Sequence, residues 1–368
     1  MDVFLAGTDS LKLTRLARRD PELLLVPAGD AHLTRRPAPP DLRALRICLP
    51  EIMSGFSPAA PLELDFFTRS SRSESRSLSS RALLATLPED AFLEVLHSDG
   101  DPWADLGNET CRLFVESPGL NLVRMEQSLR MMVERGALSP NAALFRMLTF
   151  PMEACGSYVR DPADPAFGAC LFELEPIATP ERILALLDEV SGIRGLRNAR
   201  LAAGLSQSGS GSPEETLLSF AFKLATHLGG IESPAFLENE PIAWPHEDLP
   251  FVEHTTMRPD FHWPGHRTAA EYNGRVHVSE AAFEEDQRRI RDYQSCGISA
   301  YPASYKNVRN IAALNSYLAC VAHSLARREG PGYESHVRWA LADEGSTHMR
   351  AVLLSQMLPA VPSEKPSW

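Results

Sequence analysis

The alternation of apolar and polar positions divides the N-terminal half of the chain into short strand-like and longer helix-like segments. Compact apolar runs predict strands at residues 42–49, 62–68 and 111–116. Wider apolar spacing, typical of one buried helix face, predicts helices over residues 122–135 and 141–154. These elements together indicate an N-terminal domain of mixed α/β type.

Two more helices and a change of composition mark the end of this domain. Thr179 followed by Pro180 is a capping residue before a first-turn proline, which predicts a helix start there, and a second helix is expected over residues 196–205. The stretch SQSGSGSP, residues 206–213, is expected to be a linker because consecutive Ser and Gly bury too little surface to stay ordered alone. We therefore place the N-terminal domain at residues 1–205.

The downstream pattern predicts a second domain in which a mixed sheet is flanked by helices, so the fold class of the chain is α/β. We expect helices at residues 214–227, 280–295 and 307–328, strands at 255–263, 267–273 and 298–303, and amphipathic helical structure at 333–356. The second domain is placed at residues 214–330, and a helical C-terminal extension at 331–368.

Composition and charge narrow the classes of protein. The chain is 44% hydrophobic and 23% charged, which is enough apolar material for packed cores. Its 368 residues are too many for one ordinary domain. A net charge of −12 requires any nucleic acid to meet a local basic patch. No apolar run approaches the roughly 18 residues that cross a bilayer, and the start of the chain lacks the apolar core of a signal peptide. We expect a cytoplasmic protein without membrane contact.

A Ser/Arg-rich segment, SSRSESRSLSSR, occupies residues 70–81. One interpretation is a solvated loop or a short exposed helix, because such low-complexity polar stretches do not build a core. The other is an arm that contacts phosphate or is phosphorylated. The sequence leaves both open.

The most informative segment is RPDFHWPGHRTAAEYNGRVH, residues 258–277. Gly265-His266 in its middle is typical of a two-residue hairpin turn with Gly first. The resulting register places Asp260 opposite Glu271 on one sheet face, with Cβ atoms about 5 Å apart. Two such carboxylates repel each other, so the pair predicts a cation or a shared proton, and hard oxygen ligands without thiols favour Mg²⁺ or Mn²⁺.

Three further residues are candidates for the same site. Asn273 shares the sheet face by the period of two, His277 follows shortly beyond the strand end, and Glu215 lies near the start of the preceding helix. Structural alternatives remain for each assignment. Glu215 is also the third helical residue of a capping box that begins at Ser212. His277 is also typical of a solvated loop, and Asp260 of an exposed strand or turn.

The segments SPEE, RPDFHWP and EYNGRVH, followed by Asp286, Arg289 and Gly297, make residues 212–305 resemble the very-short-patch-repair type of nuclease domain within the PD-(D/E)XK superfamily. The resemblance implies a restriction-endonuclease-like core. It also implies a metal bound by Asp260, Glu271 and the backbone carbonyl of Tyr272, with Glu215 as the helix carboxylate and His277 as the base or water-positioning group.

The upstream segments LFVESPGL and MEACGSYVRDP resemble uncharacterised actinobacterial proteins, related to abortive-infection antitoxins, that carry this domain at their C-terminus. This resemblance assigns no chemistry to the N-terminal domain. It leaves open a protein partner that binds there.

Asn273 departs from the superfamily, which usually has Lys two residues after the Glu. An amide is neither a cation nor a general base at neutral pH, so it could only orient water, and hydrolysis would depend on metal-bound water and His277. Two functions follow. One is a metal-dependent endonuclease that hydrolyses DNA phosphodiester bonds in defence, repair or mobile-element biology, and the other is an inactive nuclease-fold regulator that binds DNA or acts like an antitoxin.

A basic segment follows the paired carboxylates. Between residues 287 and 309 the chain has five Lys or Arg residues against one acid. Its candidate DNA-binding residues are Arg288, Arg289, Arg291 and Lys306. A solvated helix face, with Arg289 paired to Asp286 three positions earlier, is the alternative to phosphate contact.

Overall fold

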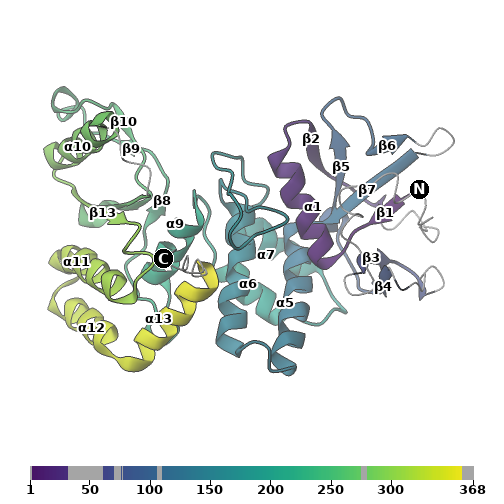
Figure 1. The fold of residues 1–368 in the computed structure, drawn as a ribbon. Coiled ribbons are helices and arrows are strands. Elements are labelled where there is room, and N and C mark those ends of the chain that lie inside the picture. Colours follow the sequence, from purple (N-terminus) through teal and green to yellow (C-terminus); the bar gives the residue numbers. More distant parts are fainter. Residues whose placement is uncertain are drawn as a thin grey trace, which may run out of the picture. The chain divides into compact units, whose positions relative to one another are not determined.

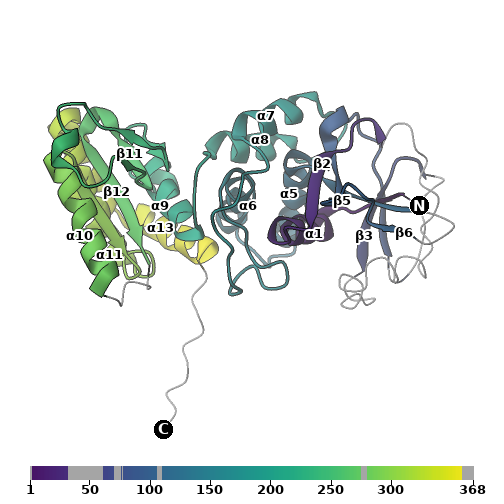
Figure 2. The same cartoon turned by 90° about the horizontal axis from the view of Figure 1, so that it is seen from above.

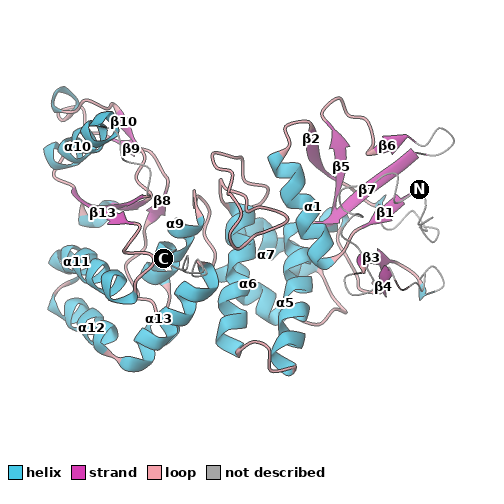
Figure 3. Cartoon of the chain, viewed as in Figure 1, coloured by secondary structure: helices cyan, strands magenta, loops and turns pink. Residues whose placement is uncertain are grey.

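The computed structural model describes residues 2–31, 61–69, 76, 78–105, 110–274 and 280–358. The chain forms two compact units, one from Met1–Ala154 with Val159–Ser206 and the other from Cys155–Tyr158 with Gln207–Trp368. Each unit combines helices and strands (Figure 3), so the α/β class is confirmed. The predicted strand at 42–49 lies outside the described residues.

The N-terminal unit is built on a mixed sheet. Its strands follow the order β1-β7-β5-β2, with β6 on β7: β1 Asp2–Phe4, β2 Leu23–Pro27, β5 Phe92–His97, β6 Ala104–Asp105 and β7 Thr110–Glu116. β1 is parallel to β7, whereas β5 is antiparallel to both β7 and β2. β3 (Leu62–Phe66) and β4 (Leu78–Ala82) form a separate parallel pair. The predicted strands at 62–68 and 111–116 are confirmed.

In the described part of this unit, five helices accompany these strands: α1 Gly7–Arg19, α5 Pro118–Glu134, α6 Pro140–Cys155, α7 Pro180–Glu189 and α8 Leu196–Leu205. The four helices predicted for this part of the chain are confirmed. α7 begins where expected because the Thr179 side chain accepts a hydrogen bond from the Arg182 N–H. Both faces of β7 are buried, since Leu113 packs with Leu13 of α1 and Phe114 packs with Leu120 of α5.

The Ser/Gly-rich segment 206–213 was expected to be a linker that does not stay ordered alone, but its backbone and side chains are held in place. The side chains of Ser206, Ser210 and Ser212 are buried. The Ser210 hydroxyl lies 2.8 Å from that of Thr216, and the Ser206 hydroxyl donates to a backbone carbonyl at 2.7 Å. Hydroxyl hydrogen bonds therefore supply the order that apolar burial cannot.

The C-terminal unit contains a four-stranded mixed sheet in the order β13-β12-β11-β8. Its strands are β8 Leu237–Glu238, β11 Phe261–Trp263, β12 Thr268–Asn273 and β13 Ser299–Ser304. β11 is antiparallel to β8 and β12, and β12 is parallel to β13. A short antiparallel pair, β9 (Ile242–Ala243) with β10 (Thr256–Met257), lies beside it.

Helices lie on both faces of this sheet, and the unit includes α9 Pro213–Lys223, α10 Glu280–Ser295, α11 Ile311–Glu329, α12 Pro331–Ala342 and α13 Glu344–Met357. Phe222 of α9 packs edge-on against Phe261 and Trp263, with ring centroids 5.2 and 5.0 Å away. On the opposite face, Tyr293 of α10 clusters with Ala269 and with β9. Figure 1 shows α10 and the β9–β10 pair on one side of the sheet and α9 and α11 on the other.

The predicted hairpin has the predicted register. Phe261 pairs with Ala270 and Trp263 with Thr268, and β11 and β12 run beside each other (Figure 2). The turn itself was predicted wrongly, because Pro264–His266 forms a 3-10 turn and Arg267, not Gly265, has a positive φ of 47°. The loop gains one residue at each end, so the pairing is unchanged.

Other boundaries differ for local reasons. The strand expected at 255–263 is split into β10 and β11, and Pro259 between them lacks the N–H that a continuous ladder needs. Segment 333–356 forms two helices because the Asp343 side chain accepts the Ser346 N–H and starts α13. These helices pack against α11 and α9 of the same unit. Among the described helices, none is both long enough and apolar enough to cross a membrane.

Candidate functional site

The β11–β12 register brings two carboxylates to one end of the hairpin. Continuing the ladder by one pair beyond Phe261 and Ala270 sets Asp260 opposite Glu271, on the sheet face that α10 covers. Asp260 Oδ2 accepts the backbone N–H of Tyr272 at 2.6 Å. The juxtaposition follows from strand geometry, and the backbone contact holds the Asp260 carboxyl in place.

The Asp260 carboxyl is in an unfavourable place for a negative charge. Burial raises its pKa well above the ordinary value, and the nearby charges of Glu215 and Glu271 raise it further. The Tyr272 N–H and the more distant Arg289 lower this pKa, but they do not cancel the effect of burial. Asp260 therefore favours either a proton or a neighbouring cation.

Glu271 is held from α10. The Arg289 guanidinium forms an ion pair with Glu271 Oε1, and the Tyr293 hydroxyl donates to the same oxygen at 2.6 Å. The hydrogen bonds from described residues go to Asp260 Oδ2 and Glu271 Oε1, and none goes to Asp260 Oδ1 or Glu271 Oε2. One oxygen of each facing carboxyl is thus available to a ligand.

Glu215 is the third helical residue of the capping box that begins at Ser212, as its structural interpretation predicted. Its N–H donates to the Ser212 hydroxyl at 3.1 Å, and that hydroxyl donates back to Glu215 Oε1 at 2.8 Å. Oε2 accepts from the Gly211 N–H and the Asn239 side chain. Burial raises the pKa of Glu215, and its charge acts on Asp260, so the capping residue is also a neighbour of the paired carboxylates.

A fourth carboxyl, that of Glu238, was missed by sequence reasoning. It comes from the two-residue strand β8, is 4% exposed and accepts a hydrogen bond from Ser219. Burial raises the pKa of Glu238 to about 8; the charge of Glu215 raises it further and Lys223 lowers it. Glu238 Oε2 has no partner among the described residues. A strand of two residues carries no periodicity, so its only sequence signal is the acidic stretch around it.

The remaining candidate residues have no described contact with the paired carboxylates. Asn273 Nδ2 lies 3.5 Å from Asp286 Oδ2, at the limit of a hydrogen bond, and His277 lies outside the described residues. Arg288 pairs with Glu285 at 3.0 Å, and Arg291 pairs with an acid on a neighbouring loop at 3.1 Å.

Only Lys306 of the four predicted DNA-binding residues is exposed without an ion pair to a described residue. Arg289 points into the site and binds Glu271. The predicted basic patch is therefore largely compensated by carboxylates of the same unit.

The donor set fits a hard divalent ion in part. No three His, Cys, Asp or Glu side chains of the described ranges lie close enough together to hold an ion. Asp260 and Glu271 nevertheless offer one oxygen each, and Mg²⁺ is commonly held by one or two carboxylates with water and substrate oxygens completing its shell. The two oxygens suit Mg²⁺ or Mn²⁺ better than zinc, because no thiol or described imidazole faces them.

Comparison with known proteins finds no matching family model, no matching curated protein and no matching solved structure.

Proposed function

We propose that the C-terminal unit is a metal-dependent, endonuclease-like domain that hydrolyses DNA phosphodiester bonds, with Mg²⁺ or Mn²⁺ held by Asp260 and Glu271. The observation that carries the proposal is the facing pair of carboxylates with one open oxygen each. Its setting in a mixed sheet between helices is the one expected of a restriction-endonuclease-like core. The resemblance to very-short-patch-repair nucleases supplies the substrate.

Each residue of the site has a distinct task in this proposal. A bound ion would supply positive charge for the phosphate and lower the pKa of a water molecule. Asp260 and Glu271 hold it, aided by the backbone carbonyl of Tyr272. Asn273 orients water by hydrogen bonding, and His277 accepts its proton.

Two residues position these groups without contacting substrate. Arg289 fixes the rotamer of Glu271 through its ion pair. Glu215 anchors the first turn of α9 and adds negative charge beside Asp260. Both are positioning residues.

A second candidate function is a catalytically inactive DNA-binding or antitoxin-like regulator. The observation that favours it is the Arg289 guanidinium on Glu271, which already supplies a positive charge beside the paired carboxylates. Asn273 in place of a Lys points the same way. In this case the site is a neutral structural network and no ion is required.

Metal binding separates the two functions. Titration of the full chain with Mn²⁺ by calorimetry is expected to show one site, and Glu271→Gln should weaken it by at least about tenfold, because it removes a charged ligand. Glu284→Gln, which changes an exposed acid of α10, is the matched control and should bind as wild type does. Identical isotherms for wild type and Glu271→Gln would overturn the proposed site.

Activity is tested on supercoiled plasmid with Mn²⁺, with Mg²⁺ and with chelator. Nicking that requires the ion and disappears in Asp260→Asn supports the endonuclease. Metal binding without nicking at any protein concentration that saturates the DNA favours the regulator instead.

A further inference from the structure

The N-terminal unit contains a hollow of about 480 Å³ between the end of β4, the middle of α5 and residues 192–194. Four of its described lining residues are arginines and none is acidic: Arg81, Arg124, Arg130 and Arg194. Guanidinium groups present several donors in a planar fork that matches phosphate oxygens. The concentration of four of them around one hollow therefore points to an anion.

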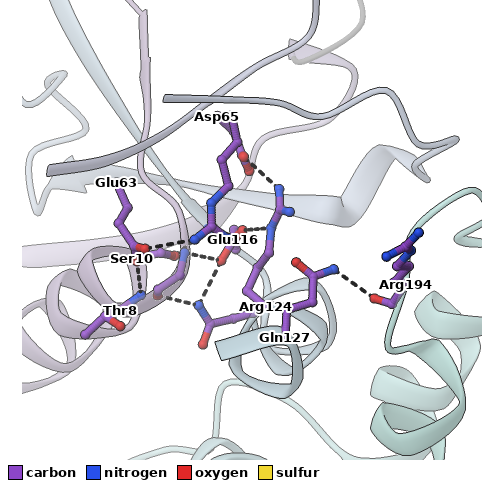
Figure 4. A network of polar contacts seen from close by, with 11 residues as sticks. Thr8, Ser10, Glu63, Asp65, Glu116, Arg124, Gln127 and Arg194 are labelled. Carbon is purple, nitrogen blue, oxygen red and sulfur yellow. Dashed lines mark hydrogen bonds and ion pairs between the residues drawn. The ribbon is translucent and has the colours of Figure 1, made fainter. Parts of the chain in front are cut away.

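Arg124 forms the floor and is fixed before any ligand arrives. Its Nε donates to Glu116 at 2.9 Å and its Nη2 to Asp65 at 2.6 Å, and the side chain is 5% exposed. Figure 4 shows the third guanidinium nitrogen on the side of Gln127 and Arg194, with no bond to another residue drawn there. A buried guanidinium held by two carboxylates loses little conformational entropy when it binds a ligand.

Arg81, Arg130 and Arg194 line the same hollow. Arg81 is held by Glu63 at 3.1 Å, and Glu63 is itself held by the Thr8 N–H. Among the described residues, the one ion-pair contact of Arg130 is a distant one, 3.8 Å from Glu134. The exposed Arg194 has no ion pair with a described residue, although its backbone carbonyl accepts the Gln127 side chain at 2.8 Å. Two cations are thus fixed, and two can adjust to a ligand.

The acids behind the floor do not cancel this positive charge. Asp65 and Glu116 are fully buried beside each other, and burial raises the pKa of both, that of Glu116 to about 7. Burial and a neighbouring negative charge both favour the protonated form of such a carboxyl. Both carboxyls bind Arg124, and neither forms an ion pair with Arg130 or Arg194, so the charges of these two arginines remain available to a ligand.

One wall of the hollow is apolar. Leu84 is 56% exposed and Met131 38% exposed, and Ile193 lies with them in the lining. Large apolar side chains exposed together beside cations suit a ligand that has an anionic and an apolar part. The volume lies within the range of pockets for small organic molecules, about 300–1,000 Å³.

We propose that this hollow binds a nucleotide-sized organic phosphate, with its phosphate on the four guanidinium groups and its base against Leu84 and Met131. Arg81 is the last residue of the Ser/Arg-rich segment 70–81. Contact with phosphate is one of the two interpretations of that segment. The site belongs to the N-terminal unit and is independent of the chemistry proposed for the C-terminal unit.

Calorimetry on the full chain tests this with adenosine 5′-monophosphate, inorganic phosphate and a single-stranded oligonucleotide as probes. We expect the mononucleotide to bind more tightly than inorganic phosphate. Arg130→Ala combined with Arg194→Ala should weaken it at least about tenfold, the loss of one charge-assisted hydrogen bond. Leu84→Ser should weaken the mononucleotide and leave inorganic phosphate unchanged.

Arg135→Ala is the matched control, since Arg135 is an exposed arginine at the end of α5 that does not line the hollow. The substituted positions are exposed or half-buried, so the fold should persist, which circular dichroism verifies. Equal binding of mononucleotide and inorganic phosphate would overturn the organic ligand in favour of a simple anion site. Binding of the oligonucleotide alone would overturn it in favour of nucleic acid, and binding of none, or no effect of the double variant, would remove the site.

Discussion

Glu215, Glu238 and Asp260 are carboxyl groups whose pKa values are all raised, in each case chiefly by burial. They come from α9, β8 and the position just before β11, and the charge of Glu215 acts on both of the others. Folding gains nothing from gathering acids in this way unless protons or a cation neutralise them. Their clustering is typical of a site that binds a cation or transfers a proton.

The free-energy cost of burying an ionised carboxyl can be measured at Glu238. Its pKa rises from an ordinary value of 4.5 to about 8, so the folded chain binds this proton more tightly than the unfolded chain does. The proton on Glu238 makes its full contribution to the free energy of unfolding below pH 4.5, and this contribution is lost as pH rises through 8. We expect Glu238→Gln to become progressively more stable than wild type across this window, by at most about 5 kcal/mol, as followed by urea unfolding at several pH values.

The exposed neighbour Glu240 supplies the control for this measurement. Glu240→Gln should follow the wild-type stability profile at every pH. If the profile of Glu238→Gln also runs parallel to wild type from pH 5 to 9, Glu238 is ionised in the folded chain and the buried acids are compensated by groups other than protons.

At the scale of elements, the start of α9 joins local helix capping to the candidate site. The Ser212 hydroxyl accepts the Glu215 N–H and donates to the Glu215 carboxyl. Ser212→Ala removes both bonds and leaves a buried carboxyl with fewer donors. We expect a loss of about 1–2 kcal/mol in the free energy of unfolding, measured by denaturant titration.

Ser212→Thr keeps the hydroxyl and should recover most of that stability. The bond at Thr179 of α7 is longer, 3.3 Å, so Thr179→Ala should cost less than Ser212→Ala. A Ser212→Thr variant as unstable as Ser212→Ala would show that the side-chain volume at this position, rather than its hydroxyl, is what matters.

The elements also show what sequence can and cannot supply. The register of β11 and β12 was predictable because alternation and a central turn constrain the pairing, and an error in the turn type left Asp260 opposite Glu271. The start of α7 was predictable because Thr179 and Pro180 act within one turn of helix. In both cases the determinants are close together in the chain.

Contacts between distant segments were not predictable in this way. Arg289 was assigned to phosphate or to a neighbour on its own helix, whereas the packing of α10 on the sheet turns it to Glu271. Glu238 lies on a strand too short to show a period. The network of Asp65, Glu116 and Arg124 joins three separate elements, and no local pattern indicates it.

At the scale of the whole molecule, the chain has two compact units with their own hydrophobic clusters and opposite kinds of candidate site. The C-terminal unit gathers carboxyl groups that suit a cation, and the N-terminal unit gathers guanidinium groups that suit an anion. A ligand that binds only the folded form of one unit stabilises that unit by mass action. The two proposals therefore make separable predictions for unfolding.

Thermal unfolding of the full chain, followed by calorimetry, is expected to show two transitions, one for each unit. Mn²⁺ at about 100 times its dissociation constant should raise one transition by roughly 5 °C or more, and adenosine 5′-monophosphate should raise the other. Glu271→Gln should remove only the Mn²⁺ shift, and Arg130→Ala with Arg194→Ala only the nucleotide shift. A variant in one unit that removes both shifts would contradict the assignment of one independent site to each unit, whereas a single transition raised by both ligands would show that the two units unfold together.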